Sequence, residues 1–140
     1  MKPTVDISGL SIRRLSRRDL ASFVILCLRA IGGKRRFREV SIAFVDDVEM
    51  TRLNRRFRHK QRTTDVLTFP GDHEEGSLGD IVISIDQAGR QAREERHSLS
   101  TEVRYLILHG LIHAHGYDHE TDCGEMNDFE MKVRKRVGLA

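Results

Sequence analysis

Residues 109–119 carry the pattern that most limits how this chain can fold, H-x-x-x-H-x-x-G-x-x-H. The residues just before it are apolar at helical spacing, which predicts that the pattern begins on a core helix. Histidines four apart on a helix lie on one face, so His109 and His113 can converge on one ion. Gly116 then ends the helix, because glycine readily adopts the left-handed conformation, and the chain can bring His119 back to the same ion.

Three neutral imidazoles with an open fourth position are typical of a catalytic zinc site rather than a closed structural one. The alternative is that one or two of the histidines only satisfy local hydrogen bonds, since surface pairs of this spacing are common. The third histidine, just past a glycine, favours metal binding over this alternative. His115 is two residues from His113, about 200° around a helix, so we expect it to face away from the ion, toward solvent or in a structural role.

For Asp118 and the two cysteines, the sequence points less strongly to a role at the metal site. Asp118 is next to His119 and could orient a ligand through a hydrogen bond, or it could simply hold the turn. Cys27 is in an apolar segment and is expected to be a small core residue. Cys123 could approach the metal, but three histidines already complete a catalytic ligand set.

The histidine spacing also resembles that of the metzincin proteases, in which a glutamate follows the first histidine. That glutamate is the general base that takes a proton from the zinc-bound water. Gly110 stands at that position here, and a glycine cannot act as a base. The site is therefore either structural, or it catalyses a reaction that needs no glutamate there.

Length and composition predict one soluble domain. The chain has 140 residues, 39% hydrophobic and 32% charged, which suits a globular protein with a core of its own. No apolar run approaches the roughly 20 residues that span a bilayer. The first residues lack an apolar signal region, so we expect the protein in the cytoplasm.

Polar and apolar periodicity predicts an α+β fold. We expect strands at residues 4–7, 39–45, 65–69 and 80–85. We expect helices from Ser16 to Ile31, from 46 onward, over 86–96, over the histidine segment after a Ser100 cap, and after a Thr121 cap. The interpretation is a single small domain, with a mixed sheet of about four strands, about five packed helices and a zinc site at the end of a core helix.

Three blocks together resemble the YbeY family, the bacterial rRNA maturation factors and single-strand endoribonucleases. They are residues 53–70 (LNRRFRHKQRTTDVLTFP), 78–84 (LGDIVIS) and the histidine block. The resemblance spans the chain, although residues 1–38 match weakly, and implies one YbeY-like zinc-dependent domain over 1–140. By this resemblance, His109, His113 and His119 would bind one zinc ion, and Arg58 would be the functional arginine of the family.

The resemblance implies an endoribonuclease that acts on single-stranded RNA. It further implies 3′-end maturation of 16S rRNA and ribosome quality control, with an rRNA precursor and the small ribosomal subunit as partners. We expect His113 and Arg58 to be catalytic. Zinc can supply an acidified water and positive charge, and Arg58 can donate two hydrogen bonds to a phosphate. RNA also carries its own nucleophile, the 2′-OH, so the nucleophile stays open. Without the resemblance, Arg58 would be read as a surface charge or a member of a salt bridge, because the segment contains many arginines.

The net charge is +3, and arginines gather in three clusters in the first half. Such runs are usually solvated faces. A phosphate backbone is nevertheless favoured over a membrane, since no basic amphipathic segment with an aromatic face is present. We expect no DNA partner. Because the block at 53–70 borders the active site by resemblance, the segment 52–62 is predicted to line an RNA groove leading to the zinc, with Arg58 nearest the ion. The predicted RNA contacts are Arg55, Arg56, Arg58, Lys60 and Arg62.

Two other functions stay open from the sequence. The chain could be a non-catalytic ribosome-assembly factor whose fold is stabilised by zinc. Less favoured is a zinc hydrolase of another bond, such as a peptide or a small amide, because Gly110 counts against peptide hydrolysis.

Overall fold

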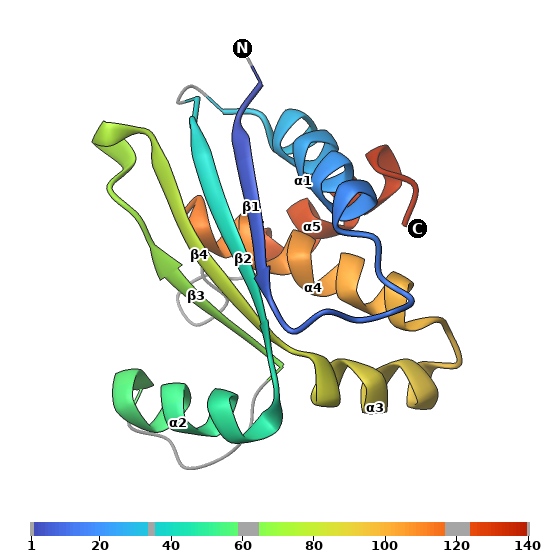
Figure 1. The fold of residues 1–140 in the computed structure, drawn as a ribbon. Coiled ribbons are helices and arrows are strands. Elements are labelled where there is room, and N and C mark those ends of the chain that lie inside the picture. The colour runs from blue at the N-terminus through green and yellow to red at the C-terminus, as the bar shows by residue number, and fades with distance from the viewer. Residues whose placement is uncertain (1, 34–35, 59–64, 117–123, 140) are drawn as a thin grey trace.

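Four strands form a mixed sheet in the order β1-β2-β4-β3. The computed structural model describes residues 2–33, 36–58, 65–116 and 124–139 (Figure 1). The strands are β1 (Thr4–Gly9), β2 (Glu39–Val45), β3 (Val66–Pro70) and β4 (Ser77–Ser84). The first two and β4 are parallel, and β3 is antiparallel to β4. The predicted mixed sheet, with an edge strand near the N-terminus, is confirmed.

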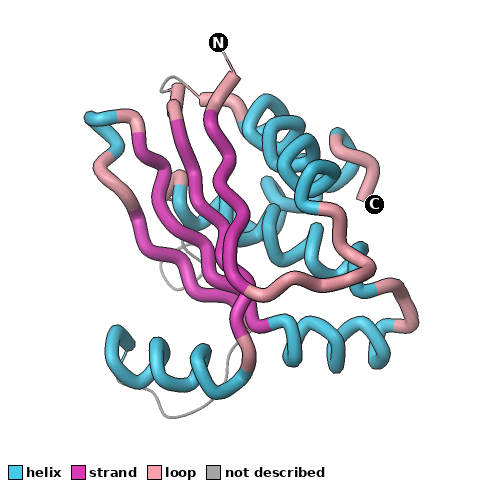
Figure 2. Tube along the Cα trace, viewed as in Figure 1, coloured by secondary structure: helices cyan, strands magenta, loops and turns pink. Residues whose placement is uncertain are grey.

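Helices connect and cover the strands of this sheet, as predicted for an α+β fold. Figure 2 shows the helices and strands along the Cα trace. The described residues form α1 (Arg17–Ile31), α2 (Asp47–Arg58), α3 (Ile85–Glu95), α4 (Leu99–Ala114) and α5 (Glu125–Arg136), with a short 3₁₀ turn, η1 (His73–Glu75). Figure 1 shows α1, α4 and α5 together on one side of the sheet and α2 apart from them at its lower end.

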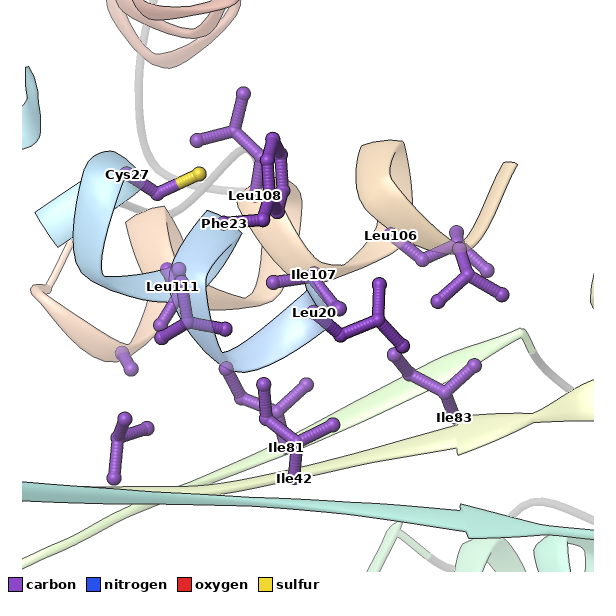
Figure 3. Close-up of a cluster of buried hydrophobic side chains, with 14 of the residues drawn as sticks. Leu20, Phe23, Cys27, Ile42, Ile81, Ile83, Leu106, Ile107, Leu108 and Leu111 are labelled. Atoms are coloured by element: carbon purple, nitrogen blue, oxygen red, sulfur yellow. The ribbon is translucent and has the colours of Figure 1, made fainter. Parts of the chain in front are cut away.

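The sheet separates two apolar clusters because side chains alternate along a strand. Ile81 and Ile83 of β4 belong to the main core, which α1 and α4 cover (Figure 3). Val82, between them, packs with Leu67 and with Met50 of α2 in a smaller cluster. Helices α2 and α4 therefore lie on opposite faces of the sheet.

Of the predicted helix N-caps, one is confirmed and one is wrong. Ser16 caps α1 as predicted, with its side chain accepting a hydrogen bond from Asp19 N. The predicted Ser100 cap of α4 is wrong: Ser98 accepts from Thr101 N and the helix begins at Leu99, so Ser100 is already in the first turn. A serine earlier in the segment satisfies the first amide groups, which lets the helix start sooner. Thr121 lies outside the described residues, and α5 follows Gly124.

Three strands also extend past their predicted ends, namely β1 to Gly9, β3 to Pro70 and β4 back to Ser77. The strand predicted over 65–69 includes Pro70 as its last residue, which pairs in register with Gly79. Proline is tolerated there because β3 is an edge strand. Pairing of Gly79 with Pro70 and of Ser77 with Glu39 makes β4 start at Ser77 rather than at residue 80.

Candidate metal centre

Helix α4 is buried on nearly all sides, and the histidines occupy its open stripe. Val103, Ile107 and Leu111 are fully buried in the main core. From residue 105 to the end of the helix, the partly exposed positions are 105, 109 and 113, spaced four apart. Tyr105, His109 and His113 therefore lie in one row along the helix. Packing in the core holds α4 in place, and the two imidazoles of this row lie near the C-terminal end of the helix.

The His109 and His113 rings lie against one another in an edge-to-face arrangement. Their centroids are 4.7 Å apart and their planes are inclined by 64°. The helix ends at Ala114, and Gly116 has a φ of 108°, which glycine tolerates without strain. The predicted helix end is confirmed. His119, the predicted third ligand, and Asp118 lie outside the described residues, and among the described residues no group of three metal-binding side chains is found.

A buried carboxylate holds His109 from the neighbouring helix. The Nδ1 atom of His109 lies 2.6 Å from Oε1 of Glu130, which is 5% exposed. Oε2 of the same carboxylate accepts a hydrogen bond from Nη2 of Arg134 at 2.7 Å. Burial opposes the charged carboxylate, but the hydrogen bond from His109 and the charge and hydrogen bond of Arg134 hold the pKa of Glu130 below its ordinary value.

These residues fit the chemistry of a zinc site. Imidazole nitrogens are preferred zinc ligands, and ligating histidines commonly donate their second ring N–H to a carboxylate. His109 and His113 supply two such rings on one face, and one of them already has its carboxylate.

A cavity of about 530 Å³ opens beside His109. Its lining includes five carboxylate side chains, which are those of Asp65, Glu94, Glu95, Glu102 and Glu130. Such a lining repels phosphate groups, since like charges at short range are unfavourable. This side of His109 is therefore the less favourable one for a polyanion, although Arg134 also lines the cavity.

His115 occupies a separate environment, in agreement with the structural role predicted for it. Its Nδ1 atom donates to the carbonyl of Leu111 at 2.6 Å, and its ring meets Phe37 edge-on at 5.1 Å. It lines a different cavity, next to Arg29 and Arg36. Burial lowers the pKa of His115, although the hydrogen bond to Leu111 opposes the shift. His115 is therefore a neutral packing residue.

The basic segment begins on the opposite face of the sheet. Arg55 and Arg56 are exposed on α2, and Arg58 ends that helix. The side chain of Arg58 and residues 59–64, including Lys60 and Arg62, lie outside the described part. Asp65, directly after this segment, lines the same cavity as His109. The segment therefore connects the arginine-bearing helix to the surroundings of the histidines.

Two residues of interest were not predicted from the sequence. Glu130 falls on the apolar stripe of α5 with the buried Met126 and Val133, at i, i+4 and i+7, and a charge in such a stripe was the available signal. Phe57 is 52% exposed at the end of α2 and contacts Phe69 edge-on. The guanidinium of Arg56 lies 5.3 Å from its ring centroid. An aromatic residue within the arginine run was the signal in that case.

A family model described as "Endoribonuclease YbeY" matches residues 11–138. The chain belongs to the YbeY family. A YbeY endoribonuclease of Nautilia profundicola is 48% identical over 103 residues, which are 73% of this chain and 74% of the relative. One of Koribacter versatilis is 42% identical over 89% of this chain and 80% of its own length.

The fold is also similar to that of a solved structure. A Thermotoga maritima protein of known solution structure superimposes with a TM-score of 0.67 and 28% identity, over 96% of this chain and 89% of the other. The predicted family is confirmed, and the predicted endoribonuclease agrees with the name that the YbeY family carries. Among the described residues, none of the helices is long and apolar enough to cross a bilayer.

Proposed function

We propose that this chain is a zinc-dependent endoribonuclease specific for single-stranded RNA, with one zinc ion held by His109, His113 and His119. The observation that carries the proposal is the pair of imidazoles 4.7 Å apart on the open stripe of α4. Family membership supplies the reaction class, because the matching family model and relatives are endoribonucleases by name.

The bound zinc would supply positive charge and a means of acidifying water at the scissile phosphate. The chain's own residues do the rest. His109 and His113 orient the ion from a helix that the core holds in place. Gly110 brings no base, which RNA tolerates better than a peptide does, because RNA contributes its own 2′-OH. Arg58 is proposed to donate hydrogen bonds to the phosphate as negative charge develops there.

Single-stranded RNA is proposed to approach along α2 and the segment after it. Arg55, Arg56, Arg58, Lys60 and Arg62 provide phosphate contacts, and the acidic cavity beside His109 makes that side less favourable for the backbone. Phe57 adds an exposed ring, on which a base can stack. A duplex offers no unstacked base for such a ring, which favours single strands.

The biological role that we propose is 3′-end maturation of 16S rRNA and ribosome quality control. The partners would be an rRNA precursor and the small ribosomal subunit, in the cytoplasm, with residues 1–140 acting as one domain. The high arginine content suits a partner that presents phosphate groups. Neither DNA nor a membrane is part of the proposal.

The test is cleavage of a labelled single-stranded RNA by zinc-loaded protein, with His113→Ala purified in parallel. We expect cleavage by the wild type, and loss of cleavage and of bound zinc in the variant. If zinc-loaded wild type binds small-subunit particles but never cuts RNA, the protein is a zinc-stabilised assembly factor. Equal cleavage by the variant would reveal a contaminating nuclease.

Hydrolysis of a peptide by the same zinc site is disfavoured by packing as well as by sequence. A Cβ atom on Gly110 would lie 2.7 Å from Cγ2 of Ile81, so the position has no room for the glutamate of a peptidase. Gly110 therefore lies on the side of α4 that packs against the sheet, not on the side that would face the metal.

A further inference from the structure

We propose that Glu130 is the positioning residue of the metal site, setting the orientation and tautomer of His109, and that Arg134 holds it in place. The inference rests on the proposed zinc site and assigns a role to a helix, α5, that contributes none of the three proposed ligands. It is drawn from contacts between α4 and α5.

The contact between His109 and Glu130 determines which ring nitrogen faces the ion. A carboxylate oxygen 2.6 Å from Nδ1 can only accept, so Nδ1 carries the proton. A neutral imidazole protonated on Nδ1 has its lone pair on Nε2. His109 therefore presents Nε2 to a metal, and the negative charge behind the ring makes that nitrogen a stronger donor.

The carboxylate is itself held on its other side. Oε2 of Glu130 accepts from Arg134 at 2.7 Å, one helical turn along α5. The Arg134 guanidinium lies 4.6 Å from the ring centroid of Tyr105, whose hydroxyl donates to the carbonyl of Leu139 at 2.6 Å. Glu130 thus has both oxygens engaged and little freedom to rotate. This is the rigidity that a positioning group needs.

Burial makes the arrangement more than a surface ion pair. Glu130 is 5% exposed, and a buried carboxylate is costly unless its partners satisfy it. The same helix buries Met126 and Val133 on this side, so a leucine or methionine at 130 would serve packing alone. The structure instead keeps a charge here, directed at the proposed ligand.

The chain contains a matched control on the same helix as His109. Oε1 of Glu102 lies 2.6 Å from Nε2 of His97, and Glu102 is 7% exposed. This pair has the same oxygen–nitrogen distance as the Glu130 pair and similar burial, although it uses Nε2 instead of Nδ1, and His97 is not a proposed ligand. Loss of stability is expected from both Glu130→Gln and Glu102→Gln, whereas loss of zinc affinity is expected only from Glu130→Gln.

The experiment is competition for zinc with a chromophoric chelator, on folded wild type, Glu130→Gln and Glu102→Gln. Glu130→Gln should weaken zinc binding by about 10-fold or more, as is usual when the carboxylate behind a ligand is removed. Glu102→Gln should bind as the wild type does. Wild-type affinity in folded Glu130→Gln would overturn the proposal, and the ion pair would then only join two helices.

A second measurement covers the case in which Glu130→Gln fails to fold. Long-range proton–nitrogen NMR of zinc-loaded wild type should show His109 protonated on Nδ1 and coordinated through Nε2. Coordination through Nδ1 would overturn the proposal. If the wild type binds no zinc at all, it is the proposed metal-dependent function that fails, and the two failures are therefore distinguishable.

Discussion

Gly110 of α4 packs directly against Ile81 of β4, with no room between them for a methyl group. An added Cβ at Gly110 would lie 2.7 Å from Cγ2 of Ile81, a distance that real Cβ atoms do not reach without a shift. Gly110, which stands where metzincin peptidases have their glutamate base, is also the point at which the histidine helix packs against the sheet.

Replacing Gly110 with alanine should therefore destabilise the protein. Overpacking costs about 1–3 kcal/mol, and the gain in helix propensity returns only about 1 kcal/mol. We expect the free energy of unfolding to fall by about 1 kcal/mol in urea titration, as the difference of these terms. Gly89→Ala is the control: it is on α3 with nothing within 4 Å, so it should stabilise the protein by about 0.5–1 kcal/mol. Stabilisation by both substitutions would contradict the close approach at Gly110.

Zinc should stabilise the folded protein through the histidine row. At a free concentration 100-fold above its Kd, a ligand that binds only the folded state contributes about 2.7 kcal/mol. We expect zinc to raise the melting temperature of the wild type and a chelator to reverse the rise. His113→Ala should lose the response, whereas His115→Gln should keep it and bind one zinc per chain. A wild type that takes up no metal on titration would remove the basis of the site.

Arg58→Ala should reduce cleavage more than binding. If Arg58 acts on the developing charge, only the transition state loses an interaction, and single-turnover cleavage falls by about 10²-fold or more, as for the loss of one preorganised donor. RNA affinity should change little. Weaker binding with unchanged single-turnover cleavage would make Arg58 a phosphate anchor.

Phe57→Leu should weaken the binding of single-stranded RNA while preserving the apolar contact with Phe69. Loss of one stacked base costs about 1–3 kcal/mol, so a clear drop in affinity is expected in fluorescence anisotropy. Val48→Ala, at an exposed position near the other end of α2, is the control and should bind normally. Equal affinities for Phe57→Leu and wild type would show that the ring does not contact RNA.

Cys27 should be unreactive in the folded protein, even in alkaline solution. Burial raises the pKa of its thiol to about 12, against a smaller opposing effect of Arg104. In a Cys123→Ser variant, Cys27 is the remaining thiol. We expect no labelling by a thiol reagent at pH 8 or 9.5, and full labelling in urea. Because the folded state favours the protonated thiol, its contribution to stability is complete below the unfolded pKa and falls as the pH rises above it. Rapid labelling of folded protein at pH 8 would contradict this burial.

Sequence patterns located most elements because these patterns are local. The strand over 39–45 has the predicted bounds, and Ser16 caps the first helix as predicted. Errors fell at helix and strand ends, where neighbouring serines compete to cap and where pairing with another strand extends an edge. The i, i+4 histidine spacing is likewise a property of one helix, so it could be recognised without a tertiary structure.

The helix with its histidine row, the glycine that ends it and the family blocks follow from the sequence alone. Tertiary structure alone decided that Glu130 meets His109, that Gly110 meets Ile81, and that α2 lies on the sheet face opposite α4. These relationships join segments distant in the chain. Periodicity shows which face of an element is buried, but packing decides which other element that face meets.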